Sequence, residues 1–154
     1  MRRSLILPLT LLFCAAAISA EAVDGRVLKV LPQFLNTNGL HTLSPSLYER
    51  DAYQVYLRNH PEERSAIRFA VQWKLKNPGR APHQLRVEIR GVAEGNLPKQ
   101  KVLERSMRGG GWFSHWSSLN FGGDEYKQFG EVTAWRVSLW DGEFLLAEQQ
   151  SFLW

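Results

Sequence analysis

The chain has 154 residues, with 19 Lys and Arg against 15 Asp and Glu, and a formal net charge of +4. Arg2 and Arg3 lie in a leader that we expect to be removed, so 17 basic residues remain and the net charge falls to about +2. The remaining basic residues are spread along the chain and form no run, which argues against a nucleic-acid partner.

The N-terminal segment has the three parts of a secretory signal peptide. Arg2 and Arg3 are its basic region, Leu5–Ala17 is apolar, and small residues stand near Ala20 and Ala22. The apolar run is shorter than the ~18 to 20 residues that a membrane anchor needs, and no later run approaches that length. We predict cleavage after Ala20, with Ala22 as the second choice, and a secreted or periplasmic protein with no membrane anchor in the mature chain.

With a signal peptide over residues 1–20, the mature chain of residues 21–154 is predicted to be a single domain. These residues, about 134 in number, can bury roughly two thirds of their unfolded surface. The one cysteine, Cys14, leaves with the leader, and Phe13 before it is too large for a lipoprotein cleavage site. Packing alone must therefore hold the domain. The lack of cysteine and of any N-x-S/T site hints at a bacterial protein.

A short amphipathic helix is predicted at about residues 46–59. Ser46 can cap its start with Glu49 at the capping-box spacing, and His60 before Pro61 marks its end. One helical stripe carries four residues: Tyr48, Ala52, Val55 and Tyr56. We expect this stripe to pack over an edge or end of the β-structure, and recruitment of a protein partner by Tyr48, Val55 and Tyr56 is the alternative.

Strict alternation of apolar and polar residues predicts the clearest strand, which ends at the turn Asn77-Pro78-Gly79. Its apolar positions are Ile67, Phe69, Val71, Trp73 and Leu75. A second alternation follows, with Leu85, Val87 and Ile89 inward. We expect the two strands to be antiparallel neighbours. Weaker patterns predict further strands over residues 26–35, 101–107 and 112–121.

A final hairpin is predicted around Asp141-Gly142, because Asp-Gly between strands favours a type I′ turn. This turn would place Leu139 opposite Phe144, and Val137 opposite Leu146, on a face that we expect to be core. About seven strands with Gly, Pro and Asn turns between them predict an all-β fold, an antiparallel β-sandwich with the helix inserted on its N-terminal side.

The last third of the chain resembles the end of an immunoglobulin-like or fibronectin type III-like domain. Leu119 and Phe121 match the strand before a short helical crossover, Tyr126 matches the tyrosine often found at that corner, and Trp135 to Phe144 match the last hairpin. The resemblance implies an immunoglobulin-like β-sandwich, without the cysteine pair of true immunoglobulins, and no particular activity.

Motifs for catalysis, cofactors or metals are not found in the sequence. His41, His60, His83 and His115 have no metal-ligand spacing, so each is predicted to lie on the surface or in a loop. There is no G-x-S-x-G elbow, P-loop or Rossmann glycine pattern. We therefore predict no catalytic residue, no metal and no cofactor. A small secreted hydrolase is an alternative, for which His115 would be mutated first because the aromatics around it could exclude water.

The stretch from Gly109 to Phe121 carries the candidate ligand-binding residues Trp112, His115 and Trp116. With Leu119 and Phe121 inward, period two turns Phe113, His115 and Ser117 inward as well. Trp112 and Trp116 then share the outer face, about 13 Å apart at ~3.3 Å per residue, where they could stack on sugar rings.

We favour the interpretation that Trp112 and Trp116 are buried, because large aromatic side chains are mostly buried in folded proteins. Either the helix stripe covers both tryptophans, or a bulge reverses their orientation. We therefore predict a secreted, non-enzymatic binding or structural module with an unknown protein or glycan partner, and a carbohydrate-binding accessory protein is the alternative.

Overall fold

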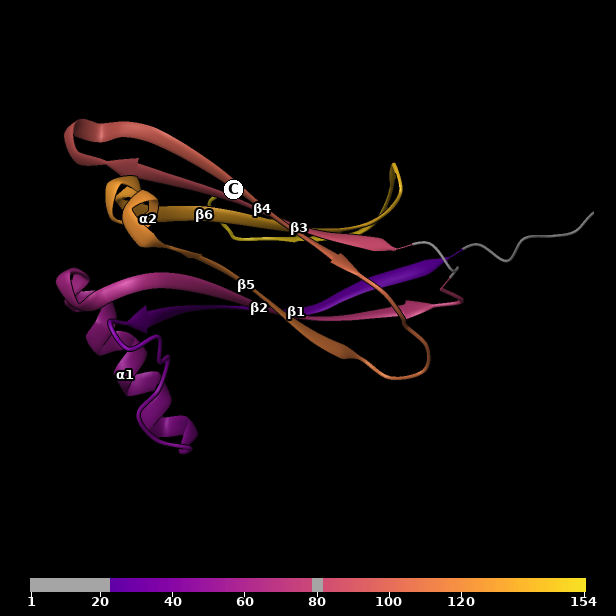
Figure 1. The fold of residues 1–154 in the computed structure, drawn as a ribbon, viewed down its shortest axis with the longest axis horizontal. Helices are drawn as coiled ribbons and strands as arrows, with labels where there is room; N and C mark the ends of the chain where they lie inside the picture. Colours follow the sequence, from indigo (N-terminus) through magenta and orange to yellow (C-terminus); the bar gives the residue numbers. More distant parts are fainter. Residues whose placement is uncertain (1–22, 79–81) are drawn as a thin grey trace, which may run out of the picture.

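The computed structural model describes residues 23–78 and 82–154, which fold into a sandwich of two antiparallel sheets with two helices (Figure 1). The sheets have the strand orders β1-β2-β5 and β4-β3-β6-β7. The strands are β1 (Asp24–Asn36), β2 (Arg64–Lys76), β3 (His83–Ala93), β4 (Leu97–Met107), β5 (His115–Gly122), β6 (Glu131–Asp141) and β7 (Phe144–Gln150). The helices are α1 (Leu47–Asn59) and α2 (Gly123–Phe129). The predicted signal peptide lies outside the described residues.

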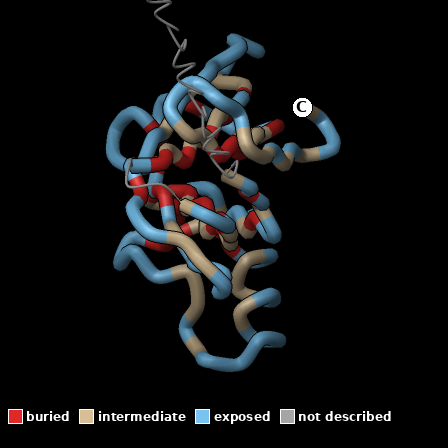
Figure 2. Tube along the Cα trace, turned by 90° about the vertical axis from the view of Figure 1, so that its right-hand side faces the viewer, coloured by how far each residue is buried: buried red, intermediate tan, exposed pale blue. Residues whose placement is uncertain are grey.

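The core lies between the two sheets and is built from the predicted alternating strands. All five apolar positions of β2 that alternation predicted are at most 3% exposed, and those of β3 are at most 1% exposed. Figure 2 shows the buried positions in the middle of the molecule and the exposed ones around it. Among the described residues, no helix is both long and apolar enough to cross a membrane.

The predicted pairing of β2 with β3 is wrong. β2 pairs with β1 and β5, whereas β3 pairs with β4 and β6 in the other sheet. Each strand has one dry face, and these faces meet across the core instead of lying side by side. Alternation therefore identified the buried face of each strand but not its neighbours.

The hairpin between β6 and β7 forms, but in a different register from the predicted one. Asp141 pairs with Phe144, so the turn is Gly142-Glu143, with Gly142 at φ 57°. A register shift after Leu139 then places that residue opposite Ala147. Phe144 is 77% exposed, so the prediction that it lies in the core is wrong. Displacing a two-residue turn by one residue moves the pairing by two residues and keeps the faces, whereas the extra β7 residue at the register shift exchanges the faces beyond it.

Helix α1 begins and ends as predicted but packs through a different face. The Ser46 side chain accepts a hydrogen bond from the Glu49 amide at 3.5 Å, and His60 follows the last residue of the helix. Leu57 is the buried residue of α1. The predicted packing stripe is exposed, with Tyr48 at 84%, Val55 at 53% and Tyr56 at 40%, so that prediction is wrong.

Gln54 makes several of the hydrogen bonds between α1 and the edge of β1, and the Tyr53 hydroxyl accepts another from the Asn36 side chain at 2.8 Å. The Gln54 side chain accepts a hydrogen bond from the Phe34 amide at 2.8 Å and donates to the Phe34 carbonyl at 3.0 Å. It also donates to the His41 carbonyl at 2.7 Å. These bonds satisfy an edge strand's free backbone groups, which would otherwise be open to pairing with another chain.

Helix α2 closes one end of the core between β5 and β6. Tyr126 and Phe129 are buried and pack edge-on against Phe121, with ring centroids 5.6 Å and 5.0 Å away. Burial raises the pKa of the Tyr126 hydroxyl above its ordinary value. In Figure 1, α2 and α1 lie at the same end of the sandwich, and the connection from β4 to β5 lies at the other.

Candidate functional site

Trp112 and Trp116 are both exposed, at 89% and 52% of their surface. The interpretation that α1 covers them is wrong, because α1 lies at the opposite end of the sheet (Figure 1). Within β5 the predicted orientation holds at Leu119 and Phe121, which are buried, whereas His115, predicted to point inward, is exposed at the start of the strand. Phe113, predicted to point inward, is 81% exposed, because β5 begins only at His115 and period two does not extend before it.

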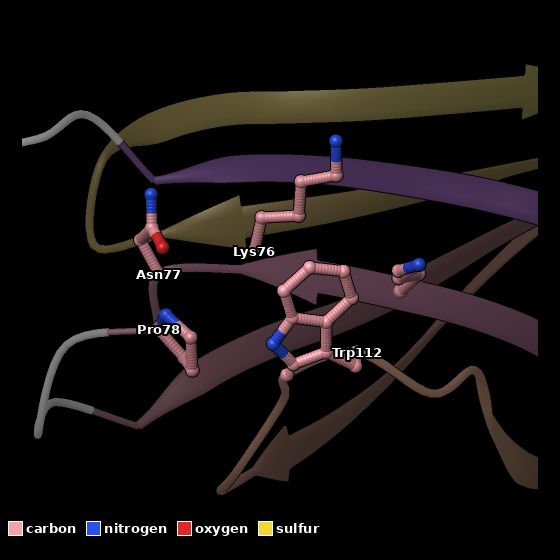
Figure 3. Close-up of a pocket in the computed structure, with 6 residues that line it drawn as sticks. Lys76, Asn77, Pro78 and Trp112 are labelled. Atoms are coloured by element: carbon pink, nitrogen blue, oxygen red, sulfur yellow. The ribbon is translucent and has the colours of Figure 1, made fainter.

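Trp112 forms one wall of a groove of about 430 Å³ at the end of β2 (Figure 3). The groove, called the tryptophan groove below, is lined by Lys74, Lys76, Asn77, Pro78, Gly111 and Trp112. The Gly111 amide donates to the Leu75 carbonyl at 2.8 Å. A Cβ at Gly110 would come within 2.9 Å of Leu75 and of Pro78. The glycines thus let the loop lie close against β2, which holds Trp112 beside the lysines.

Trp116 lies on the outer face of the same sheet, in one row with Gln72 and Lys29. Gln72 is opposite Trp116 on one side and opposite Lys29 on the other. The Gln72 side chain also donates to the Ser114 hydroxyl at 3.0 Å, which ties the loop to the sheet. Residues directly opposite in antiparallel strands share a face, so Trp116 extends the surface that begins at the tryptophan groove.

His115 belongs to the other face of β5. It is opposite Trp73, a core residue, and their ring centroids are 5.1 Å apart. The Trp73 indole nitrogen in turn donates to the Ser117 hydroxyl at 3.0 Å. The structure therefore brings Trp112 and Trp116 to one surface and places His115 at the open end of the core, apart from them.

The prediction that every histidine lies on the surface or in a loop is wrong for His83, which is 1% exposed. His83 begins β3 and is paired with Asp141 and Met107 on the neighbouring strands. Its Nδ1 lies 3.3 Å from an Asp141 carboxylate oxygen, yet neither ring nitrogen makes a hydrogen bond within the described part of the chain. Among the described residues, no serine, threonine or cysteine is hydrogen-bonded to the His83 ring.

Basic side chains gather on the outer face of β1 and β2. Alternation in β2 turns its polar positions outward, and register places Arg26 opposite Lys74 and Lys29 opposite Gln72. We call this surface the basic face: Arg26, Lys29, Arg68, Lys74 and Lys76. Asp24, opposite Lys76, is its one acid, and it lies 4.0 Å from both Arg26 and Lys76. Residues spread along the sequence are thus assembled by strand pairing.

On the outer face of the second sheet, basic residues lie opposite acidic residues on the neighbouring strands. Arg86 is opposite Glu104 with their charged atoms 3.0 Å apart, and Arg136 is opposite Glu88 with a hydrogen bond of 2.6 Å. The C-terminal Trp154 also covers this face, with its ring centroid 3.9 Å from the Arg90 guanidinium carbon. Arg86 and Arg136 are thus paired with acids across strands, whereas Lys29 and Lys74 of the basic face have no ion pair among the described residues.

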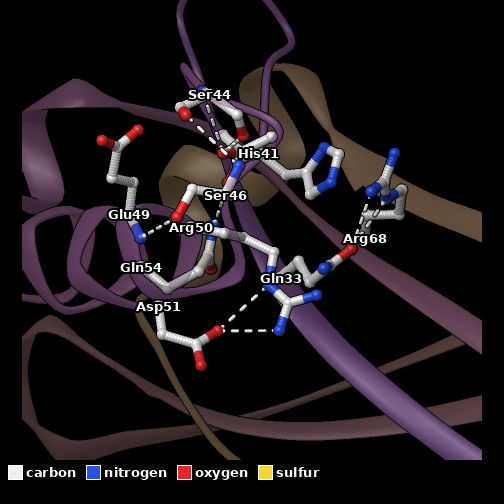
Figure 4. A network of polar contacts seen from close by, with 10 residues as sticks. Gln33, His41, Ser44, Ser46, Glu49, Arg50, Asp51, Gln54 and Arg68 are labelled. Carbon is white, nitrogen blue, oxygen red and sulfur yellow. Dashed lines mark hydrogen bonds and ion pairs between the residues drawn. The ribbon is translucent and has the colours of Figure 1, made fainter.

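A second polar cluster joins α1 to the basic face (Figure 4). The Arg68 guanidinium donates to the Gln33 side chain at 2.7 Å. Partial burial, followed by the charges of Arg68 and Arg50, lowers the pKa of His41 below its ordinary value of 6.5. His41 therefore binds a proton less readily in the folded chain than in the unfolded chain.

This depressed pKa predicts that stability falls as the pH is lowered from above 6.5, because the unfolded state then takes up more protons than the folded state. Urea unfolding at pH 7.5 and pH 5.5 measures the loss. In His41→Gln the loss should be smaller than in the unmodified chain. Equal losses in the two proteins would contradict the assignment to His41.

No group of three or more His, Cys, Asp or Glu placed to hold a metal is found among residues 23–78 and 82–154. Comparisons of the chain with family models, with curated proteins and with solved structures found no match. The case for a function therefore comes from the chain's own surface.

Proposed function

We propose that this protein is an exported, non-enzymatic carbohydrate-binding β-sandwich module whose ligand surface includes Trp112 and Trp116. The observation that carries the proposal is the exposure of both indoles, at 89% for Trp112 in the loop beside Lys74 and 52% for Trp116 on β5. Exposing large aromatics to water without a partner is unfavourable, so exposed aromatics that adjoin a groove indicate a binding surface. The apolar face of a sugar ring pairs well with a flat indole.

The fixed position of Trp112 supports this proposal. The Gly111 amide is bonded to Leu75, and Gln72 is bonded to Ser114, so both sides of Trp112 are anchored to β2. Preorganisation of this kind lowers the entropic cost of binding. The groove beside the indole has polar lysine and asparagine groups that can bond to sugar hydroxyls.

We place the sandwich among the immunoglobulin-like architectures. In support, β1, β2 and β5 share one sheet and β3, β6 and β7 share the other, as the corresponding strands of an immunoglobulin constant domain do. Here β4 pairs with β3, whereas the fourth strand of that domain joins the first sheet. Export is part of the proposal and is tested by sequencing the N-terminus of the mature protein.

Trp112→Ala and Trp116→Ala test the proposed surface. Each change should alter the free energy of unfolding by no more than about 1 kcal/mol, because both indoles are largely exposed. Each should weaken glycan binding on the order of tenfold through the lost stacking. Urea unfolding and affinity electrophoresis through a panel of neutral and acidic polysaccharides measure the two effects.

Phe144→Ala is the matched control, since it removes an aromatic ring that is 77% exposed on the hairpin of the other sheet. It should leave retardation by every polysaccharide unchanged. If no polysaccharide in the panel retards the unmodified protein, the proposal is contradicted. A loss of ~3 to 5 kcal/mol in either tryptophan variant would show instead that the indole is needed for folding.

The partner-facing role of Tyr48, Val55 and Tyr56 stays a prediction. Their exposure on α1 leaves them accessible to a protein. The Tyr56 hydroxyl donates a hydrogen bond to the Glu63 carboxylate at 2.5 Å, and its ring stacks on His60 with ring centroids 4.0 Å apart.

A further inference from the structure

We propose that the ligand of the Trp112 and Trp116 surface is an acidic polysaccharide, with carboxylates held by the basic face. This inference rests on the proposed carbohydrate-binding function and adds the charge of the ligand. It depends on three observations: the like charges placed opposite each other, the missing acids around them, and the position of the lysines beside the tryptophans.

The first observation is a pair of like charges on neighbouring strands, which lowers the stability of the sheet. Arg26 and Lys74 are directly opposite on β1 and β2, where side chains are close neighbours. Like charges at such positions destabilise a sheet. The second sheet of the same molecule places Arg86 opposite Glu104 and Glu88 opposite Arg136. The unfavourable pairing on the first sheet is therefore a local exception, as expected where a bound anion supplies the missing charge.

The second observation is the lack of acids around these cations. Asp24 is the only acid on the outer face of β1 and β2, at one end, and lies 4.0 Å from Arg26 and from Lys76. Lys29 and Lys74 have no ion pair with an acid among the described residues, and Arg68 is bonded to the neutral Gln33 side chain. The face thus has capacity for negative charge from outside the chain.

The third observation is that charge and stacking surface coincide. Lys74 and Lys76 line the groove whose wall is the Trp112 ring (Figure 3). Lys29 lies in the same row as Gln72 and Trp116. A sugar stacked on Trp112 therefore has the ammonium groups of Lys74 and Lys76 beside it, and Lys29 lies two strands, about 10 Å, across the sheet from Trp116. A neutral glycan would use the tryptophans but leave the lysines unpaired.

Polygalacturonate and its fully methyl-esterified form test this inference, because the two polymers share a backbone and differ in charge. At 50 mM salt the protein should bind the acidic form on the order of tenfold more tightly than the ester, and 300 mM salt should remove most of the difference. The double variant Lys29→Gln/Lys74→Gln should lose about tenfold in affinity for the acidic form and little for the ester.

Lys99→Gln/Lys127→Gln is the control, since it removes the same charge from β4 and α2 and should bind both polymers as the unmodified chain does. Equal binding of the two polymers would overturn the inference and leave carbohydrate binding intact. Failure to bind either polymer would also overturn it, while the polysaccharide panel above judges the proposed function separately. A single-stranded oligodeoxynucleotide that binds as tightly as polygalacturonate would overturn the choice of a glycan.

Discussion

Gly130→Ala should lower the free energy of unfolding by at least about 3 kcal/mol. Gly130 lies between α2 and β6 with φ 83° and ψ −147°, a backbone region that is essentially open only to glycine. A Cβ there would come within 2.2 Å of the Val92 carbonyl oxygen and 2.6 Å of the Ala93 Cα. Both neighbours are backbone atoms of β3, so they cannot rotate away as a flexible side chain could.

Gly142→Ala separates the two causes of this effect. Gly142 also has a positive φ, of 57°, but a Cβ there would meet nothing within 4 Å. It should therefore cost only about 1 kcal/mol, from the backbone conformation alone. Urea unfolding of the two variants measures the difference. Equal losses would contradict the close contact between Gly130 and β3.

The alternation of polar and apolar residues predicted the core because it depends only on local geometry. In β2 it identified Phe69 and Trp73 as buried, and in β3 it identified Leu85 and Ile89. A strand has one period and two faces, so five or six residues are enough to assign the dry face. Ser46 was likewise predictable as a cap, because its hydrogen bond reaches only three residues along the chain.

Features that depend on distant partners were missed. Sheet membership of β2 and β3 is decided by the strands on either side of each, and no local pattern reports them. The burial of His83 follows from its pairing with Asp141 and Met107, which are both distant in sequence. The packing face of α1 was not predicted correctly. The buried residue of the helix is Leu57, and the predicted stripe of four residues did not include it.

In the candidate site as well, local features could be predicted and features that depend on distant partners could not. The outward direction of Trp116 follows from the alternation along its strand, whereas its exposure depends on the fold around it. The basic face could not be predicted from the sequence, because Arg26 and Lys74 are far apart in the chain and become neighbours only through strand pairing. The one available signal would have been the outward basic residues of the predicted strand at 67–76, which are Arg68, Lys74 and Lys76.

Arg64→Ala should lower the free energy of unfolding by about 2 to 4 kcal/mol, because it removes the hydrogen bonds that a buried guanidinium donates to two carbonyls at the end of α1. The Arg64 side chain is 6% exposed, and its guanidinium donates to the Leu57 carbonyl at 2.6 Å and to the Arg58 carbonyl. It also lies 3.2 Å from Glu131 and 4.1 Å from the centre of the Phe34 ring. One side chain therefore joins the end of α1 to β1 and β6.

Hydrogen exchange should show the largest loss of protection in α1, because its last turn is where Arg64 binds. Arg86→Ala is the control, since Arg86 is 39% exposed in its ion pair with Glu104 and its removal should cost no more than ~1 kcal/mol. A loss below about 1 kcal/mol in Arg64→Ala, with α1 protection unchanged, would contradict this role. Because α1 and the tryptophan groove lie at opposite ends of β2, folded Arg64→Ala should still bind polygalacturonate as the unmodified chain does. Stability and ligand binding can then be altered independently in this sandwich.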